Sequence, residues 1–149
     1  MGKRTRFLYA AATGFCAAII FCCALFTVFM VGPAIETRIF PAVSKLQILS
    51  LAGNDGQALV MAQFTKLRGE CEYLGIAWFK GSPEGDFERV PVVLQRQEGD
   101  NSSPNRPPGT QRAGPWIIGM TPAELMTSSF ARLSHRCHPF WVTTTDFWP

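Results

Sequence analysis

The stretch FLYAAATGFCAAIIFCCALFTVFMVG, residues 7–32, contains no charged side chain and follows closely after the cations Lys3, Arg4 and Arg6. Its 26 residues exceed the roughly 20 that a helix needs to cross the hydrocarbon core of a bilayer. Cytoplasmic flanks of membrane helices carry an excess of Lys and Arg. The sequence therefore predicts a cytoplasmic basic flank at residues 1–6 and a transmembrane signal-anchor helix at residues 7–32, with the C-terminal part outside the cytoplasm.

The predicted helix is expected to end at Pro33, because proline lacks the N–H that a helix interior requires. Residues 33–41 are then a juxtamembrane connector, and residues 42–149 form one extracytoplasmic β-rich domain. A cleavable signal peptide is the alternative, since Gly32-Pro33-Ala34 resembles a weak cleavage site. The apolar region of such peptides usually has only about 7–15 residues, which favours the anchor.

The net charge of +3 comes entirely from the three cations of the basic flank. After residue 32, 11 basic residues balance 11 acidic residues, and no cluster of Lys or Arg is present. Binding to nucleic acid depends on such basic patches. We therefore predict no nucleic-acid partner.

Small side chains recur at every fourth position of the anchor, at Ala10, Gly14, Ala18 and Cys22. Residues at this spacing share one face of a helix, and small residues allow two membrane helices to approach closely. The pattern predicts a helix-packing face for a homodimer or for another membrane protein. An ordinary alanine-rich span is the alternative interpretation.

Two of the five cysteines, Cys71 and Cys137, lie outside the anchor. Two cysteines in an oxidising compartment most simply form one disulfide. This agrees with a cell inner (plasma) membrane protein whose C-terminal domain is periplasmic or extracellular.

The pattern after Pro41 predicts short strands near residues 44–51, 57–67, 71–80, 87–96, 116–119 and 131–137, and the strand at 71–80, apolar on both faces, should be central. Pro91 cannot donate to a sheet, so its strand should lie at an edge or be bulged. Residues 98–115 are predicted to be a long irregular loop, and Thr121-Pro122-Ala123-Glu124 is a helix-start signal. The pattern predicts an antiparallel β-sandwich with one short helix.

The predicted sandwich is immunoglobulin-like in architecture only. An inter-sheet disulfide between Cys71 and Cys137 would suit that architecture. However, Trp78 follows the first cysteine too closely for an immunoglobulin domain, and His135 stands where the corner tyrosine would be. We expect Trp78 and Trp116 to lie in the core.

The only dense group of chemically active side chains is His135-Arg136-Cys137-His138. With Cys71 it offers two thiols and two imidazoles, which zinc can accept, but the spacing matches no standard motif. A disulfide beside a core histidine explains the same residues. No nucleophile elbow or phosphate-binding loop is present. We therefore predict no catalytic residue, no bound metal and no cofactor.

The sequence favours a non-enzymatic, single-pass membrane protein that acts in interaction or assembly. Its partners would be the lipid bilayer and another envelope or membrane protein. We expect the partner surface to include Arg106, Pro107, Pro108, Trp141 and Trp148. Two alternatives are a phage-encoded or envelope lysis accessory protein and a metal-dependent enzyme that uses the His135/His138 region.

Overall fold

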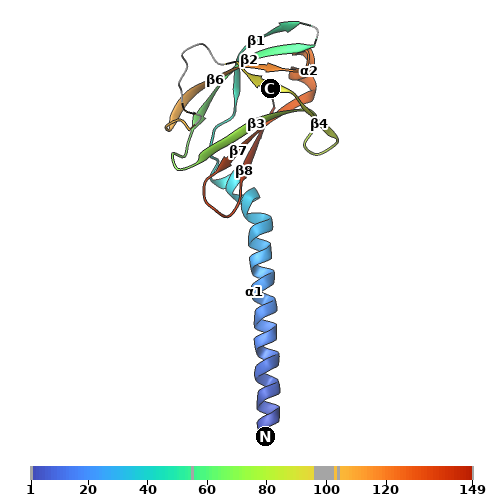
Figure 1. The fold of residues 1–149 in the computed structure, drawn as a ribbon, viewed down its shortest axis with the longest axis vertical. Coiled ribbons are helices and arrows are strands. Elements are labelled where there is room, and N and C mark those ends of the chain that lie inside the picture. Colours follow the sequence, from blue (N-terminus) through green and yellow to red (C-terminus); the bar gives the residue numbers. More distant parts are fainter. Residues whose placement is uncertain (1, 55, 96–102, 104, 149) are drawn as a thin grey trace.

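A computed structural model describes residues 2–54, 56–95, 103 and 105–148, and shows one long helix that projects from a β-domain (Figure 1). The helix α1 spans Lys3–Ile39, which is about 55 Å at 1.5 Å per residue. Residues 6–31 are exposed in the isolated chain. The helix is long and apolar enough to cross a membrane, a test that N-terminal signal sequences also pass. It is therefore a candidate membrane anchor or signal sequence.

The helix continues through Pro33, so the predicted helix end at this residue is wrong. Proline removes one hydrogen bond, but the following turn is well bonded. The Thr37 hydroxyl donates to the Pro33 carbonyl over 2.9 Å, and the Phe40 N–H donates to the Glu36 carbonyl over 2.8 Å. The predicted connector is therefore helical as far as Ile39.

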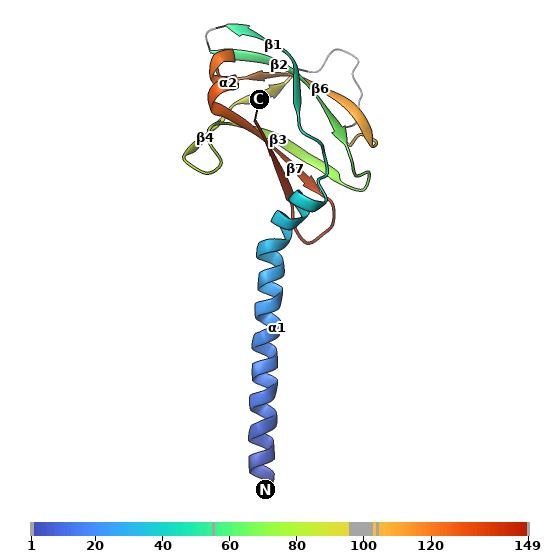
Figure 2. The ribbon, with the colours of Figure 1, turned by 180° about the vertical axis from the view of Figure 1, so that it is seen from behind.

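The domain contains two antiparallel four-stranded sheets in a sandwich-like arrangement (Figures 1 and 2). The first sheet has the order β1 (Gln47–Asn54), β2 (Gln57–Lys66), β6 (Gly109–Ile118), β5 (Val92–Leu94). The second has the order β4 (Phe87–Val90), β3 (Glu72–Gly81), β7 (Ser129–Arg136), β8 (Thr143–Phe147). The predicted mainly-β, antiparallel architecture is confirmed.

The main core lies between the two sheets and is closed by the short helix α2 (Pro122–Ser128). Val60 and Ile118 contribute from the first sheet, Trp78 from the second and Leu125 from α2, all with no exposed surface. The Trp78 ring lies 6.2 Å from that of Trp116. The expected core positions of both tryptophans are confirmed.

The strand that contains Pro91 divides at this residue between the two sheets. Its first half, β4, pairs only with β3, and its second half, β5, pairs only with β6. Both halves are edge strands. The prediction is confirmed, because a residue without an N–H is tolerated at an edge or at a break in a ladder.

The predicted irregular loop at residues 98–115 is wrong in its second half, because residues 109–115 belong to β6, which is central in the first sheet. Val60 pairs with Trp116 and Ala62 pairs with Ala113, so Gly114 and Pro115 form a bulge. The bulge accommodates a proline that has no N–H to donate. Residues 98–102 and 104 of the predicted loop lie outside the described residues.

Candidate functional site at the helix–domain junction

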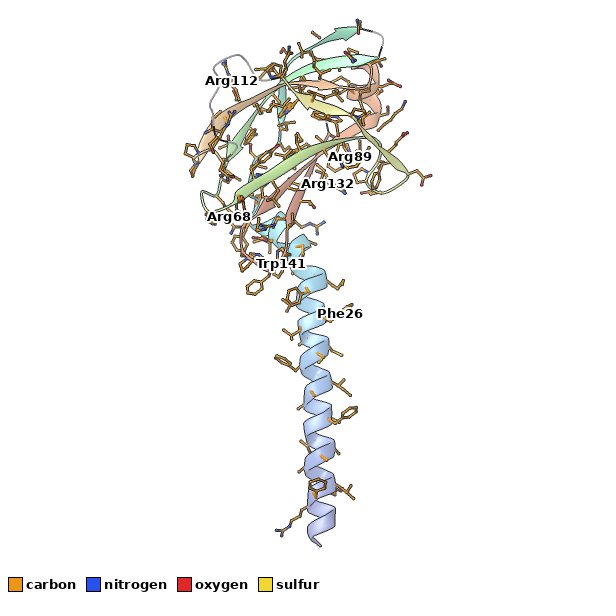
Figure 3. The ribbon with its side chains drawn as sticks, in the orientation of Figure 1. Phe26, Arg68, Arg89, Arg112, Arg132 and Trp141 are labelled. Atoms are coloured by element: carbon orange, nitrogen blue, oxygen red, sulfur yellow. A yellow bond between two sulfur atoms is a disulfide. The ribbon has the colours of Figure 1, made fainter. Side chains whose placement is uncertain are left out.

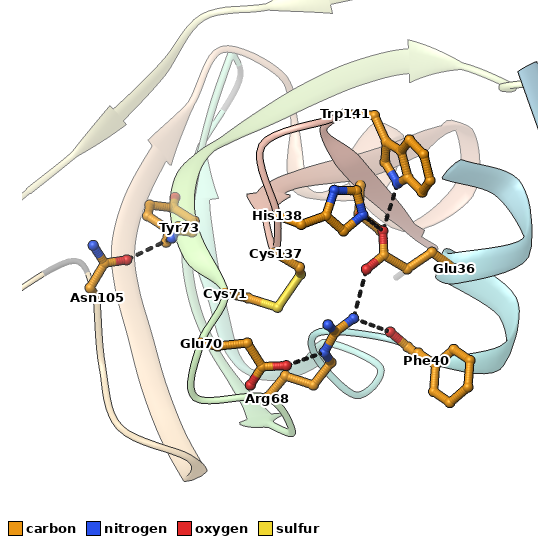
Figure 4. Close-up of a disulfide and its surroundings, with 11 residues drawn as sticks. Glu36, Phe40, Arg68, Glu70, Cys71, Tyr73, Asn105, Cys137, His138 and Trp141 are labelled. Carbon is orange, nitrogen blue, oxygen red and sulfur yellow. Dashed lines mark hydrogen bonds and ion pairs between the residues drawn. A yellow bond between two sulfur atoms is a disulfide. The ribbon is translucent and has the colours of Figure 1, made fainter. Parts of the chain in front are cut away.

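Glu36, in the last turn of α1, is the centre of a polar cluster that joins the helix to the domain (Figure 4). Only 8% of the residue is exposed. Its Oε2 accepts hydrogen bonds from the Thr143 hydroxyl at 2.6 Å and the Trp141 indole N–H at 2.7 Å. Arg68 Nη1 donates to Oε1 at 2.7 Å, and His138 Nε2 lies 3.2 Å from Oε2. The carboxylate therefore contacts four side chains of the domain.

The loops that supply Arg68, His138 and Trp141 meet because β3 and β7 are neighbouring strands. Glu72 pairs with Arg136, so the residues just beyond this pair, Cys71 and Cys137, face each other and form a disulfide. The predicted cysteine pairing is confirmed. The expected inter-sheet position is wrong, because both cysteines flank adjacent strands of the same sheet.

The disulfide lies within a few residues of the groups that hold Glu36. Arg68 precedes Cys71 by three positions, and His138 follows Cys137 directly. The bond therefore links the β2–β3 connection to the β7–β8 loop beside the carboxylate (Figure 4). A covalent link here restricts both loops in the folded and in the unfolded chain.

Backbone contacts reinforce the junction. The Leu67 N–H donates to the Ala42 carbonyl over 2.9 Å, and Val43 forms an isolated antiparallel bridge with Lys66. On the other side, the Thr37 hydroxyl also lies within 3.0 Å of the Thr144 carbonyl. The chain thus enters the domain within a few residues of the helix end, without a free linker.

Trp141 also contacts the apolar end of the helix. Its ring meets that of Phe29 edge-on, with 6.2 Å between centroids. A Cβ built on Gly32 would lie 2.7 Å from the Trp141 ring. Glycine at position 32 therefore leaves the space that this indole occupies.

Glu36 is ionised in this environment. Burial by itself would raise its pKa, but hydrogen bonds from Thr143, Arg68 and Trp141, together with the nearby His138, outweigh burial and lower the pKa to about 2. A carboxylate that is stabilised by several donors is a weak base. The arrangement is thus suited to fixing a helix on a domain rather than to proton transfer.

Arg68 connects this carboxylate to a second one. Its Nε donates to Glu70 at 2.7 Å while Nη1 donates to Glu36. The hydrogen bonds to Glu70 and then Glu36 raise the pKa of Arg68. The guanidinium therefore partly neutralises Glu36 at the base of the domain.

The four residues considered for zinc do not converge on a single point. The two cysteine sulfurs are bonded to each other, and His138 contacts Glu36. His135 is 2% exposed and packs edge-on against Tyr73. Within the described ranges, no group of three His, Cys, Asp or Glu side chains has a metal-binding arrangement.

His135 is held in a neutral form inside the domain. Burial, and then the charge of Lys66, lower its pKa to about 4. Among the described side chains, none forms a hydrogen bond with its Nδ1. A neutral core histidine is therefore the better description of this residue.

The residues of the predicted partner surface lie on different parts of the domain. Arg106 donates to the Arg112 carbonyl, and Pro108 lies close to Gly69 beside the β2–β3 connection. Trp148, by contrast, is exposed after β8. The indole N–H of Trp141 donates a hydrogen bond to Glu36. A partner at these positions stays a prediction.

The predicted helix-packing face is exposed along the isolated helix at Ala10, Gly14, Ala18 and Cys22. A Cβ built on Gly14 would meet no atom within 4 Å. The face is accessible to a second helix, and its use stays a prediction.

Sequence reasoning did not identify Glu36, Arg68 or Thr143 as site residues. One signal was available, because Glu36 is the first acidic residue of the chain and follows the apolar run by four positions. An acidic side chain so close to a predicted membrane boundary is a candidate for a specific partner. Comparison with protein-family models, with curated proteins and with solved structures finds no match for this chain.

Proposed function

We propose that the protein is a non-enzymatic, single-pass membrane protein that presents a disulfide-linked β-domain outside the cytoplasm for interaction or assembly. Its N-terminus is cytoplasmic, and α1 crosses the inner or plasma membrane. The domain binds another envelope or membrane protein. The observation that carries this proposal is the cluster around Glu36, which joins a long apolar helix to a folded domain without a flexible linker.

Retention of the helix is supported by Gly32. This residue belongs to the apolar run and also contacts Trp141 of the folded domain. A cleaved signal peptide would remove part of a packed interface. The disulfide between Cys71 and Cys137 supports an oxidising location.

Interaction rather than catalysis is supported by the state of the titratable groups. Glu36 is engaged by several donors, and His135 is buried in the core. The exposed Pro107 and Pro108 precede β6, and Trp148 follows β8. Exposed prolines and tryptophans are suited to contact with another protein, because they provide area at a low entropic cost.

The test is a topology measurement on the full chain, expressed in a bacterial host with a C-terminal epitope. After alkaline carbonate extraction, we expect the protein in the membrane pellet at its full mass. Protease added to spheroplasts should remove the epitope, whereas protease added to inside-out vesicles should not. Non-reducing mass spectrometry should show the Cys71–Cys137 bond and unmodified Cys16, Cys22 and Cys23.

A variant in which Phe21 and Phe26 are both replaced by Lys provides the control, because two charges within the apolar run oppose insertion. It should move to the soluble fraction or be degraded. Extraction of the wild-type chain by carbonate contradicts the anchor. Recovery of a wild-type chain whose first residue lies after position 32 contradicts it as well. Protection of the epitope in spheroplasts contradicts the orientation.

A further inference from the structure

We propose that the folded domain itself contacts the membrane surface through the β7–β8 loop, residues 137–142, with Phe140 inserted at the boundary between lipid headgroups and acyl chains. This inference rests on the proposed membrane anchoring by α1. It adds a second lipid contact, which the anchor by itself does not require.

The depth of the loop follows from its contact with the helix. Trp141 packs against Phe29 and Gly32, which lie in the last turn of the uncharged run. Figure 3 shows Trp141 beside the end of the helix that is nearest the domain, while side chains further along project freely. If residues 7–32 cross the bilayer, the loop lies where the chain leaves the hydrocarbon.

Trp141 itself has the geometry of an interfacial residue. Its ring contacts apolar side chains, and its N–H donates to Glu36, which lies beyond the apolar run. Tryptophan is enriched at membrane–water interfaces because its ring is apolar and its N–H is polar. The indole therefore marks the level of the interface on the outer side.

Phe140, next to this indole, has no comparable cover within the domain. It is 67% exposed, although its ring lies 5.6 Å from His138 and 6.3 Å from Trp141. The loop contains no Asp, Glu, Lys or Arg. An exposed aromatic side chain in an uncharged loop is suited to an apolar surface, and the acyl boundary is the nearest one.

The helix end carries exposed apolar residues close to this loop. Ile39 and Phe40 are 61% and 62% exposed, and Ile35 is also exposed. Arg38, exposed among them, can approach a lipid phosphate. Ile35 and Ile39 are one helical turn apart and therefore share one face of the helix, away from Glu36, which contacts the domain. Because this face continues from the end of the uncharged run, the lipid around that run is the nearest apolar occupant.

The test is photo-crosslinking of the full chain in nanodiscs of phosphatidylcholine and phosphatidylglycerol. A benzophenone-bearing phenylalanine replaces Phe140 in one variant, Phe21 of the anchor in a second and Phe87 of β4 in a third. Phe87 is a matched control, because it is an exposed phenylalanine in an edge strand of the domain. Intact mass after irradiation identifies adducts of one phospholipid.

We expect phospholipid adducts at positions 140 and 21, with a yield at position 140 several times that at position 87. Adducts at position 21 without adducts at 140 overturn this inference and leave the anchor intact. No adduct at position 21 overturns the anchor, and this inference with it. Adducts between position 140 and a second copy of the chain assign the loop to a protein interface instead.

A measurement on the unlabelled chain guards against misfolding of the labelled variants. Phosphatidylcholine that is brominated near the headgroup should quench part of the tryptophan emission of the wild-type protein. The Trp141→Phe variant should lose that quenched part. Equal quenching of the two proteins, or none in either, contradicts the position of the loop at the interface.

Discussion

The indole N–H of Trp141 donates to Oε2 of Glu36 over 2.7 Å and so joins two residues that lie 105 positions apart in the chain. One belongs to the last turn of α1, and the other belongs to the loop before the final strand. A single buried carboxylate therefore fixes the position of the helix relative to the folded domain. The orientation of the domain depends on this contact and on the groups around it.

Substitution Glu36→Gln should loosen the junction and leave the β-sandwich folded. The variant loses the negative charge that accepts hydrogen bonds from Arg68, Trp141 and Thr143. We expect a loss of about 2 kcal/mol, equivalent to ~30-fold easier local opening of the β7–β8 loop. Hydrogen exchange of residues 137–143 in detergent micelles measures this opening. Glu70→Gln is the control, because Glu70 also pairs with Arg68 but is solvent-exposed; equal effects would contradict the role of Glu36.

Substitution Gly32→Ala should displace the Trp141 ring, because the added Cβ would lie 2.7 Å from it. The end of the indole has to move, which weakens its hydrogen bond to Glu36. We expect a red shift of tryptophan emission and faster exchange in the β7–β8 loop. Gly14→Ala is the matched control, since a Cβ at that position meets no atom within 4 Å. An unchanged spectrum for Gly32→Ala would show that the indole does not pack there.

Removal of the disulfide in a Cys71→Ser/Cys137→Ser variant should destabilise the domain by about 2–4 kcal/mol, because the bond closes a long loop in the unfolded chain. Urea unfolding of the full chain in micelles measures this difference. A Cys22→Ser/Cys23→Ser variant changes two exposed free cysteines of α1 and serves as the control. An equal loss of stability in both variants would show that the Cys71–Cys137 bond does not stabilise the domain.

Stability of the domain should fall as the pH decreases from about 6.5 to 4. Burial lowers the pKa of His135 from 6.5 to about 4, so the unfolded chain binds a proton over this range and the folded chain does not. The loss approaches ~3 kcal/mol at the acidic end. Thermal unfolding at a series of pH values measures it, and His135→Phe should flatten the curve in this window.

The contribution of Glu36 to the stability of the fold is lost over a different pH range. Its pKa is about 2 in the folded state, against 4.5 for the free group. The stabilisation is thus present above about pH 4.5 and is lost as the pH falls towards 2. In a His135→Phe variant, stability should therefore stay level between pH 6.5 and 4.5 and fall below pH 4.5; a loss that persists above pH 4.5 would contradict the assignment of that window to His135.

Substitution Thr121→Ala should destabilise the domain by about 1 kcal/mol through the loss of the N-cap of α2. The Thr121 hydroxyl accepts from the Glu124 N–H at 3.2 Å, and the Glu124 carboxylate accepts from the Thr121 N–H at 3.1 Å. Urea unfolding measures the effect. Thr127→Ala is the control, because its exposed hydroxyl bonds only to the Ala123 carbonyl one turn earlier. Thr121→Ala should lower the free energy of unfolding clearly more than Thr127→Ala does.

Features that depend on composition or on neighbouring residues could be predicted from the sequence. The capping box needs only Thr121 and Glu124, and both of its hydrogen bonds are present. The break at Pro91 follows from the missing N–H of proline. The disulfide could be predicted because only two cysteines lie outside the apolar run.

Features that depend on which distant segments become neighbours could not be predicted. Residues 109–115 appeared irregular because glycine and proline conceal the alternation, yet pairing with β2 makes them a strand. The inter-sheet position of the disulfide was wrong because cysteine spacing does not reveal which strands are adjacent. The cluster at Glu36 was missed because its members come from three separate segments.

Four features follow from composition or from local backbone chemistry, and so can be recognised in the chain without its fold: the uncharged run, the balance of charge after it, the cap of α2 and the pair of cysteines. Other features depend on how distant segments pack: the helix continues past Pro33, Glu36 is buried and ionised, and Trp141 occupies the space beside Gly32. The physical reason is that a buried carboxylate is stable only when donors surround it. Strand pairing brings these donors together from distant segments, with Arg68 32 positions from Glu36 and Trp141 and Thr143 more than 100 positions away.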